Sequence, residues 1–360
     1  MKKLIIKGMD RRYFSDKIVK WYCENKRSLP WRNTRDPYKI WLSEIILQQT
    51  RVSQGLPYYR QFVRRYPSVT SLAKASEQAV LRLWQGLGYY TRARNLHKCA
   101  KEIVQFHHGK FPRTYHDLLP LPGIGEYTAA AIASFAYHEP VPVVDGNVFR
   151  ILSRIFGIDT PINTPEGKKQ FTRLAGELIS DTDPALHNQA VMEFGALFCT
   201  PKNPQCIDCG LKSGCFAFNH DLVNTLPVKT QKKKSRTRHF FYLVVERNGA
   251  VLMKKRDGRD IWQGLFDFPM IEKSRPARLQ NVIADLISES RLSRASIGAV
   301  SKTYTHILTH QVIYCRFVTV NVPSGIPTPD GNFAFYTSSQ IAKLPKPALI
   351  SRFLDEQKTR

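Results

Sequence analysis

The sequence predicts a molecule in two parts, an all-α part that ends near residue 220 and an α+β part that begins at His239. Apolar residues recur at helical spacing through most of the first 198 positions. After His239 they form strand-like runs, and Asn248-Gly249 is typical of a two-residue hairpin. A chain of 360 residues is long enough for two domains, each with its own core.

A basic stretch separates the two parts. The segment from Lys229 to Arg238, KTQKKKSRTR, contains six basic residues and no acid. Such a segment is expected to be extended, and it could track a DNA backbone or serve only as a solvated tether. We therefore expect a first domain over 1–220, a linker over 221–238 and a second domain over 239–360.

The net charge of the chain limits the classes of molecule that it is expected to bind. Lys and Arg number 54 and Asp and Glu 29, which gives a net charge of +25. A field of that sign favours nucleic acid or an anionic membrane. No apolar run approaches the roughly 18 residues of a membrane-spanning helix, and the N-terminal run is too short for a signal peptide. We expect a DNA-binding protein of the cytoplasm, located on the nucleoid if the source is bacterial, with no membrane partner.

A single acid, Glu44, lies on the apolar helix expected over 36–50. Its helix neighbours include Ile40, Trp41 and Leu47. A carboxylate among apolar side chains should have a raised pKa, as a general acid at neutral pH requires. The loop before this helix contains Trp31, which would touch DNA or a base, or simply pack against the helix.

The segment WQGLGYYTRARN, from Trp84 to Asn95, combines glycines, aromatic rings and arginines. Proteins that extract a base from a duplex need wedges to fill the gap and cations to hold the backbone. Taken alone, the residues favour a core turn with a solvated arginine face.

The most informative stretch is Leu119 to Arg150, LPLPGIGEYTAAAIASFAYHEPVPVVDGNVFR. Gly123 and Gly125 precede an alanine-rich helix, so backbone N–H groups at its start can bind a phosphate. A later acid, Asp145, precedes a second helix and would lie beside the held duplex. Asp is also a favoured N-cap, so capping alone would account for it equally well.

Four of the seven cysteines lie within seventeen residues, as Cys199-x6-Cys206-x2-Cys209-x5-Cys215. In a reducing compartment such clustering indicates a metal rather than disulfides. Zinc and a 4Fe–4S cluster fit four thiolates about equally on chemistry alone.

Several motifs, in order along nearly the whole chain, resemble one family. LPGIGEYTA followed by VDGNV resembles the helix-hairpin-helix, Gly/Pro-and-Asp signature of base-excision DNA glycosylases. SEIILQQT, GLGYYTR, the cysteine spacing and the C-terminal part resemble the MutY-type adenine DNA glycosylases. The resemblance implies an all-α helix-hairpin-helix glycosylase domain with an iron–sulfur loop, a 4Fe–4S cofactor, and an α+β Nudix-like C-terminal domain.

The resemblance also implies a function: a monomer that removes adenine mispaired with 8-oxoguanine or guanine in double-stranded DNA. Glu44 would protonate the adenine, and Asp145 would stabilise the oxocarbenium-like sugar. The implied supporting residues are as follows: Tyr127 and Asn147 assist Asp145; Arg32, Gln189 and Trp31 contact the adenine; Gln49, Leu87 and Tyr89 wedge into the stack; Gly123 and Gly125 hold phosphate; Thr305 and His306 sense 8-oxoguanine.

Three departures from related patterns matter. Bifunctional relatives place a Schiff-base lysine where this chain has Tyr127, so we predict no strand cleavage. A Nudix hydrolase needs a row of glutamates on its helix, and here only Asp285 and Glu289 are available. Tyr304-Thr305-His306 replaces the usual Phe-Ser-His, which is a conservative change. The alternatives are an endonuclease III-like glycosylase/lyase, which Tyr127 disfavours, and a non-catalytic lesion-binding protein, which would not need Glu44 and Asp145.

Overall fold

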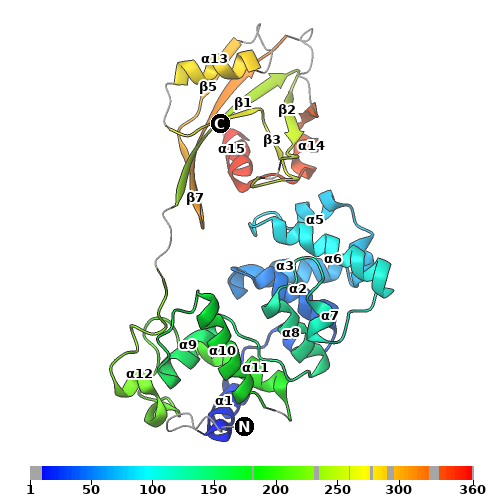
Figure 1. Ribbon diagram of the computed structural model, residues 1–360. Helices are drawn as coiled ribbons and strands as arrows, with labels where there is room; N and C mark the ends of the chain where they lie inside the picture. The colour runs from blue at the N-terminus through cyan, green and yellow to red at the C-terminus, as the bar shows by residue number, and fades with distance from the viewer. Residues whose placement is uncertain are drawn as a thin grey trace. The chain divides into compact units, whose positions relative to one another are not determined.

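The computed structural model describes residues 10–180, 182–230, 235–258, 260–275, 279–289, 296–323 and 332–358. The chain forms two compact units (Figure 1). The first, the helical unit, comprises 1–73 and 98–231. The second, the sheet unit, comprises 232–360 together with 74–97, a segment that the sequence places inside the helical part.

The helical unit is built from helices, as the sequence predicted for the first part of the chain. They are α1 (Arg11–Asn25), η1 (Pro30–Arg32), α2 (Pro37–Leu47), α3 (Val52–Arg65), α4 (Val69–Ala73), α7 (Tyr115–Leu118), α8 (Glu126–Tyr137), α9 (Gly146–Phe156), α10 (Pro165–Leu178), α11 (Pro184–Leu197), η2 (Lys212–Gly214) and α12 (Phe216–Asn219). A further helix, α6 (Thr91–His107), crosses the boundary between the units and begins inside the glycine- and tyrosine-rich segment.

Two groups of helices build the core of the helical unit. One cluster joins Phe14, Ile18 and Tyr22 of α1 to apolar residues of α9, α10 and α11. The other pairs α2 with α8, whose alanines are buried. Small side chains let two helix backbones approach closely, so polar groups on the facing sides of α2 and α8 come within hydrogen-bonding distance.

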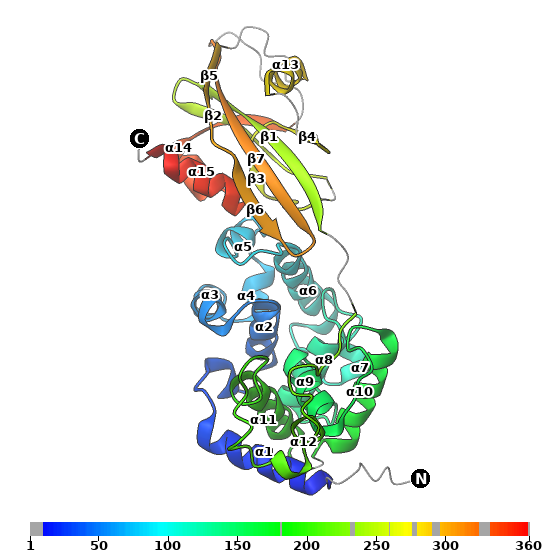
Figure 2. The same cartoon turned by 90° about the vertical axis from the view of Figure 1, so that its left-hand side faces the viewer.

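The described residues of the sheet unit form one eight-stranded sheet (Figure 2). The helices and strands of the sheet unit are α5 (Glu77–Leu83), β1 (Arg236–Arg247), β2 (Ala250–Lys255), β3 (Phe266–Asp267), β4 (Met270–Lys273), α13 (Leu279–Glu289), β5 (Ser296–Val300), β6 (Tyr304–Leu308), β7 (Gln311–Asn321), β8 (Phe333–Thr337), α14 (Ser338–Lys343) and α15 (Ala348–Lys358). Asn248 and Gly249 both have positive φ, which confirms the predicted hairpin between β1 and β2.

Helices cover both faces of this sheet, and Figure 2 draws α13 and the α14–α15 pair on opposite sides. Val282 and Ile283 of α13 pack with Phe241 and Val318 on one face. On the other face, the ring of Phe353 in α15 stacks on Phe317 with centroids 4.0 Å apart. Alternate side chains of each strand therefore belong to different cores.

Residues 301–303 separate β5 from β6, and Pro345 and Pro347 lie between α14 and α15. The expected linker loses its last three residues to β1, which pairs with β7 from Arg236 onward. Residues 231–234 of that linker lie outside the described residues, as does the side chain of Glu289.

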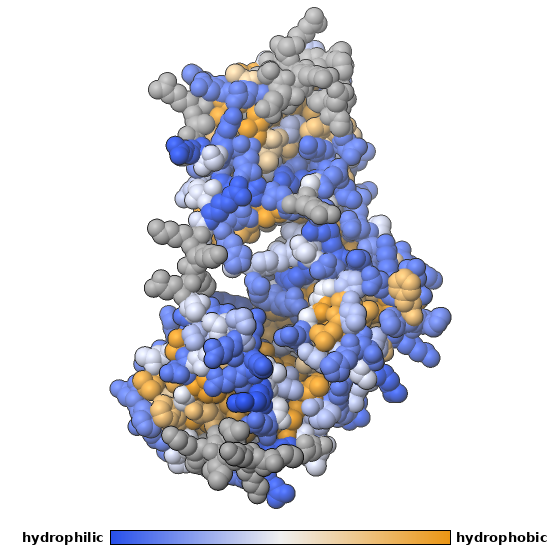
Figure 3. Space-filling model, viewed as in Figure 1, coloured by the Kyte–Doolittle hydropathy of each residue, from blue (hydrophilic) through white to orange (hydrophobic). Residues whose placement is uncertain are grey.

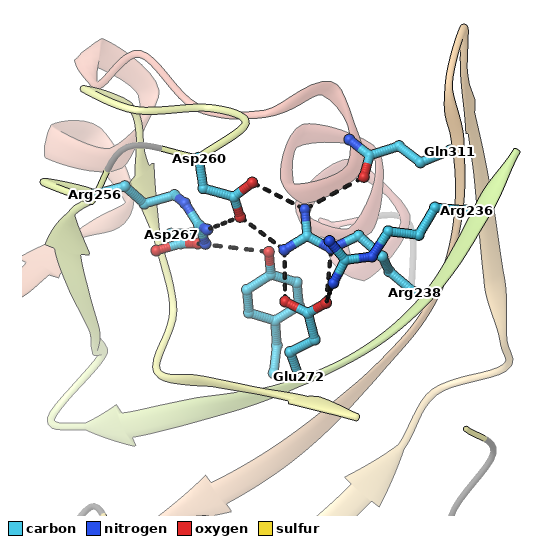
Figure 4. Close-up of polar contacts among 8 residues, drawn as sticks. Arg236, Arg238, Arg256, Asp260, Asp267, Glu272 and Gln311 are labelled. Carbon is cyan, nitrogen blue, oxygen red and sulfur yellow. Dashed lines mark hydrogen bonds and ion pairs between the residues drawn. The ribbon is translucent and has the colours of Figure 1, made fainter. Parts of the chain in front are cut away.

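The start of β1 is fixed by a buried ionic network (Figure 4). Arg238 is 5% exposed and donates to Asp260 at 2.7 and 2.9 Å and to Glu272 at 2.5 and 2.8 Å. Arg256 donates to Asp260 and, at 2.6 Å, to Asp267. A residue that the basic run suggested would be solvated is therefore a structural anchor of the sheet.

The surface is polar over most of the face drawn in Figure 3. Within the described part of the chain, no helix is both long enough and apolar enough to cross a membrane.

Candidate active site

Glu44 lies on the buried side of α2 and is 7% exposed. The helix begins at Pro37, behind the Asp36 side chain that accepts a hydrogen bond from the backbone N–H of Tyr38. Glu44 Oε2 accepts a hydrogen bond of 2.6 Å from the hydroxyl of Tyr127 on α8. Burial raises the pKa of Glu44 to about 7, and the charge of Asp145 acts in the same direction, while Tyr127 and Arg32 oppose it. The predicted rise in this pKa is confirmed.

Asp145 is the N-cap of α9. Its Oδ1 accepts from the backbone N–H groups of Asn147 and Val148 at 2.8 and 2.9 Å, and its Oδ2 accepts from Asn147 Nδ2 at 2.7 Å. Burial raises the pKa of Asp145, and these hydrogen bonds, together with the charge of Arg150, oppose the rise. The capping interpretation is thus correct. The capping hydrogen bonds also hold the carboxylate close enough to Glu44 for the two charges to interact.

Two residues were predicted to assist Asp145, and the structure separates them. Asn147 contacts Asp145 directly. Tyr127 donates instead to Glu44, and burial together with the neighbouring charges of Glu44 and Asp145 raises its pKa well above the usual phenol value. Its hydroxyl therefore stays protonated and remains a hydrogen-bond donor.

A second buried acid, Glu193 on α11, was missed by the sequence analysis. Its oxygens accept from Arg27 Nη2 at 2.5 Å and Nε at 2.8 Å, and from both terminal nitrogens of Arg32 at 2.6 and 2.7 Å. Burial alone would raise the pKa of Glu193, but these hydrogen bonds and the charge of Arg32 outweigh it and lower the pKa to about 2. The signal was present, because Glu193 is the one acid within the apolar sequence of α11.

A cavity of about 450 Å³ opens beside this ion-pair group. Arg32 and Gln189, both predicted to contact adenine, line it, as do Tyr22 and Arg27. The Tyr22 hydroxyl donates to Gln189 Oε1 at 2.8 Å and so orients the amide. Trp31 is absent from this lining: it is 8% exposed and packs edge-on against Tyr59. This partner lies on α3, not on the helix over 36–50 that the packing interpretation named.

The hairpin before α8 has the expected conformation. Gly123 has φ of 75°, a region that L-residues with side chains rarely adopt. Gly125 is the N-cap of α8 and provides no side-chain cap, so the first backbone N–H groups of the helix have no side-chain acceptor at that position. This is the arrangement that can bind a phosphate.

The three predicted wedge residues differ in exposure. Gln49 of the helical unit is exposed and has φ of 56°. In the sheet unit, Tyr89 is 43% exposed with φ of 48°, whereas Leu87 is only 6% exposed. A positive φ at a residue with a side chain is uncommon and often marks a functional position. Of the two residues in the glycine-rich turn, only Tyr89 presents its side chain to solvent.

Thr305 and His306 lie on β6 of the sheet unit and point to opposite faces. Thr305 is exposed. The His306 ring lies 5.6 Å from that of Trp262, and burial lowers its pKa. Tyr304 is 3% exposed, and its hydroxyl donates to Glu356 at 2.8 Å.

Cys199, Cys206, Cys209 and Cys215 line a single cavity, whose apolar walls include Phe194, Phe198 and Leu211. Within the described residues, no three His, Cys, Asp or Glu side chains are arranged as metal ligands. Burial raises the pKa of Cys206, Cys209 and Cys215, but hydrogen-bond donors reach the sulfurs. Arg154 Nη1 donates to Cys199 Sγ at 3.4 Å, and the backbone N–H of Leu211 donates to Cys209. Four sulfurs, hydrogen-bond donors and an apolar shell fit an iron–sulfur cluster.

Arg150, one helical turn before Arg154 on α9, joins this loop to the acids. Its Nε donates to the carbonyl of Cys199 at 2.7 Å, and its Nη2 donates to Asn147 Oδ1 at 2.8 Å. Asn147 in turn contacts Asp145. Arg150 and Cys199 lie far apart in the sequence, and no residue spacing predicted that they would meet.

Comparisons with known proteins agree with this geometry. The model of the HhH-GPD superfamily of base excision DNA repair proteins matches residues 42–178, and that of the NUDIX domain matches residues 240–356. An adenine DNA glycosylase of Buchnera aphidicola subsp. Baizongia pistaciae is 36% identical over 308 residues, which cover 84% of each chain. This chain belongs to the adenine DNA glycosylases.

Solved structures of other DNA glycosylases resemble the fold of this adenine DNA glycosylase. A thermostable thymine-DNA glycosylase is 30% identical, with a TM-score of 0.55, and covers 58% of this chain and 96% of its own. Endonuclease III in a non-covalent DNA complex is 19% identical, with a TM-score of 0.52, over 59% of this chain and 99% of its own. The predicted fold class, a helix-hairpin-helix glycosylase domain with a Nudix-like C-terminal domain, is confirmed.

Proposed function

We propose that this protein is a monofunctional adenine DNA glycosylase that removes adenine paired with 8-oxoguanine or guanine from duplex DNA, acting as a monomer. The observation that carries the proposal is the pairing of buried Glu44 on α2 with half-buried Asp145 at the N-cap of α9. Glu44, with a pKa of about 7, is held by Tyr127, and Asp145 lies close enough to influence that pKa. A protein that only binds lesions needs neither group.

The chemistry follows from the two protonation states. The adenine leaves the stack and enters the site, where protonated Glu44 donates its proton to N7 and makes the base a better leaving group. The N-glycosidic bond breaks, and the positive charge that develops on the sugar is stabilised by the Asp145 carboxylate. Glu44, now ionised, removes a proton from the attacking water.

The same site supports the prediction of little lyase chemistry. A Schiff-base mechanism needs an amine nucleophile beside the sugar. At the position of that amine stands Tyr127, a phenol whose pKa is raised and which is engaged with Glu44. Borohydride should therefore trap little of the protein on substrate DNA.

Cys199, Cys206, Cys209 and Cys215 would hold a 4Fe–4S cluster, whose role is to fix the loop that also presents Lys202 and Lys212 to phosphates. Thr305 and His306 would sense 8-oxoguanine from the second domain, which begins with β1 at Arg236. Visible absorption and metal analysis of the purified protein distinguish iron from zinc.

The experiment that tests the function is single-turnover excision of adenine opposite 8-oxoguanine by wild type and Glu44→Gln. Glu24→Gln, an exposed acid on α1, is the matched control. Loss of a general acid should slow excision by about 10²- to 10⁴-fold, whereas the control should match wild type. Equal rates for Glu44→Gln and wild type would overturn the mechanism, and no excision by wild type would overturn the function.

A further inference from the structure

The segment 74–97 is held by the sheet unit, although the residues that flank it in the sequence belong to the helical unit. It comprises α5, a glycine-rich turn and the start of α6. Arg94 Nη1 donates to the backbone carbonyl of Gln263 at 2.6 Å, and Lys255 Nζ lies 3.6 Å from Glu77 Oε1. The sheet unit therefore contacts the segment near both of its ends.

The glycine-rich turn between α5 and α6 has an unusual backbone. The φ angle is 103° at Gly86, 73° at Gly88 and 48° at Tyr89. A positive φ is uncommon for a residue with a side chain and persists only where the surroundings hold it. Within the segment, Trp84 Nε1 donates to the carbonyl of Gly88 at 3.0 Å, and Arg92 Nη2 donates to the same carbonyl at 3.3 Å. These two contacts shape the turn, but they do not attach it to the rest of the sheet unit.

Gln85, which directly precedes the turn, makes that attachment. Its Nε2 donates to Ser351 Oγ of α15 at 2.9 Å. Its Oε1 accepts from the backbone N–H of Lys346 at 3.4 Å and from Arg82 Nη1 of α5 at 2.9 Å. One side-chain amide therefore bridges α5, α15 and the loop before α15.

The turn presents Tyr89, whose side chain is 43% exposed. The Tyr89 hydroxyl contacts Thr309 Oγ1, between β6 and β7, so the tip of the side chain also meets the sheet unit. The proposed function makes Tyr89 a wedge in the base stack, and the further inference rests on that function. Separating stacked bases costs free energy, so a wedge is effective only where the backbone that carries it does not yield.

We propose that Gln85 is a positioning residue for Tyr89: it fixes the base of the turn to α15, so that the wedge stays in place while the adenine leaves the stack. Gln85 acts through the backbone of the turn and not on the reacting atoms. Without its amide, Trp84 and Arg92 still shape the turn, but the turn can shift against α15. Loss of Gln85 therefore lowers the fraction of bound duplexes whose adenine is extruded and leaves proton transfer from Glu44 unchanged.

Gln85→Ala and Ser351→Ala, alone and combined, test this assignment in the full-length protein. Both residues line a cavity of about 570 Å³, so neither truncation opens a void in a packed core. Gln105→Ala, at an exposed glutamine on α6, is the matched control. Extrusion is measured by the fluorescence of 2-aminopurine placed beside a non-hydrolysable 2′-fluoro adenine nucleotide opposite 8-oxoguanine.

We expect Gln85→Ala to reduce the fluorescence rise and to slow single-turnover excision by about tenfold. The inflection of its pH–rate profile should match that of wild type, because Glu44 keeps its contacts. Ser351→Ala should show a smaller defect of the same kind, since Gln85 keeps its contacts with Lys346 and Arg82. The double variant should match Gln85→Ala, because both substitutions remove the same hydrogen bond.

Extrusion and excision by Gln85→Ala at the level of Gln105→Ala would overturn the inference, as would defects of Gln85→Ala and Ser351→Ala that multiply in the double variant. A lowered urea midpoint with normal extrusion would also overturn it, because Gln85 would then support only the fold. Extrusion is measured without excision, so wild type that extrudes adenine but does not release it would overturn the proposed function instead.

Discussion

Two buried acids of the helical unit lie in similarly apolar helices, yet their pKa values are shifted in opposite directions. Glu44 on α2 and Glu193 on α11 each lie in an apolar helix, at 7% and 1% exposure. Glu44 is paired with one neutral phenol and lies near another acid, and its pKa is about 7. Glu193 is held by two guanidinium groups, and its pKa is about 2. Burial alone therefore does not make an acid catalyst; the partners decide whether a buried carboxyl holds its proton.

Removing the charge of Glu193 should have the largest effect on the free energy of unfolding. In Glu193→Gln the side chains of Arg27 and Arg32 lose their shared carboxylate, so the free energy of unfolding should fall by about 3–5 kcal/mol. Urea denaturation at pH 7 measures the loss. Glu177→Gln, which removes an exposed pair with Arg173, is the control and should cost less than about 1 kcal/mol.

The two acids should also give opposite pH dependences of stability. Glu193 has a folded pKa below the ordinary 4.5, so its stabilisation is complete above that pH and is lost as pH falls toward 2. The deficit of Glu193→Gln should therefore begin to shrink below pH 4.5. A deficit that stays constant from pH 7 to pH 4 would contradict the ion-pair explanation.

Glu44 should show the reverse sign, with a somewhat smaller effect. Its folded pKa of about 7 exceeds the ordinary 4.5, so between these values the folded state binds more protons than the unfolded chain. Wild-type stability then falls as pH rises toward 7, and Glu44→Gln escapes this cost. At pH 8 the variant should be more stable than wild type by up to about 3 kcal/mol, with no difference at pH 4. Urea midpoints that do not diverge with pH would refute the raised pKa.

The sequence was sufficient for the first acid and insufficient for the second. A lone carboxyl among apolar helix neighbours identified Glu44, and motif resemblance supplied Tyr127 and Asp145. The same local signal exists at Glu193, but its meaning depends on Arg27 and Arg32, which lie more than 160 positions away in the chain. The local sequence pattern predicts that a carboxyl is buried, but it does not predict which side chains will contact it.

A similar limit applies to the sheet unit. Strand-like apolar runs after His239 predicted a sheet, yet β1 begins three residues earlier because Arg238 is buried by Asp260 and Glu272 from elsewhere in the chain. A basic run is normally a solvated segment, and only the tertiary contacts show that one of its arginines is internal. The connection of Arg150 to both Cys199 and Asn147 was invisible for the same reason.

The rate of excision should follow the protonation state of Glu44. Because the acid must donate a proton and its pKa is about 7, the single-turnover rate constant should fall as pH rises above 7, by about tenfold per pH unit. Measurements from pH 5 to pH 9, with DNA affinity followed in parallel, separate catalysis from binding. A flat profile above pH 7 would exclude Glu44 as the proton donor.

The smallest and sharpest change is to remove one hydrogen bond from Glu44. In Tyr127→Phe the carboxylate loses the donor that lowers its pKa, so the pKa should rise and the inflection of the pH–rate profile should move up by about one unit. Tyr137 lies on the same helix as Tyr127, and its hydroxyl donates to the carbonyl of Phe111. Tyr137→Phe removes that hydroxyl and should leave the inflection unchanged. A shift to lower pH in Tyr127→Phe would mean that the phenol favours the protonated acid, and the difference between Glu44 and Glu193 would then rest on the guanidinium groups alone.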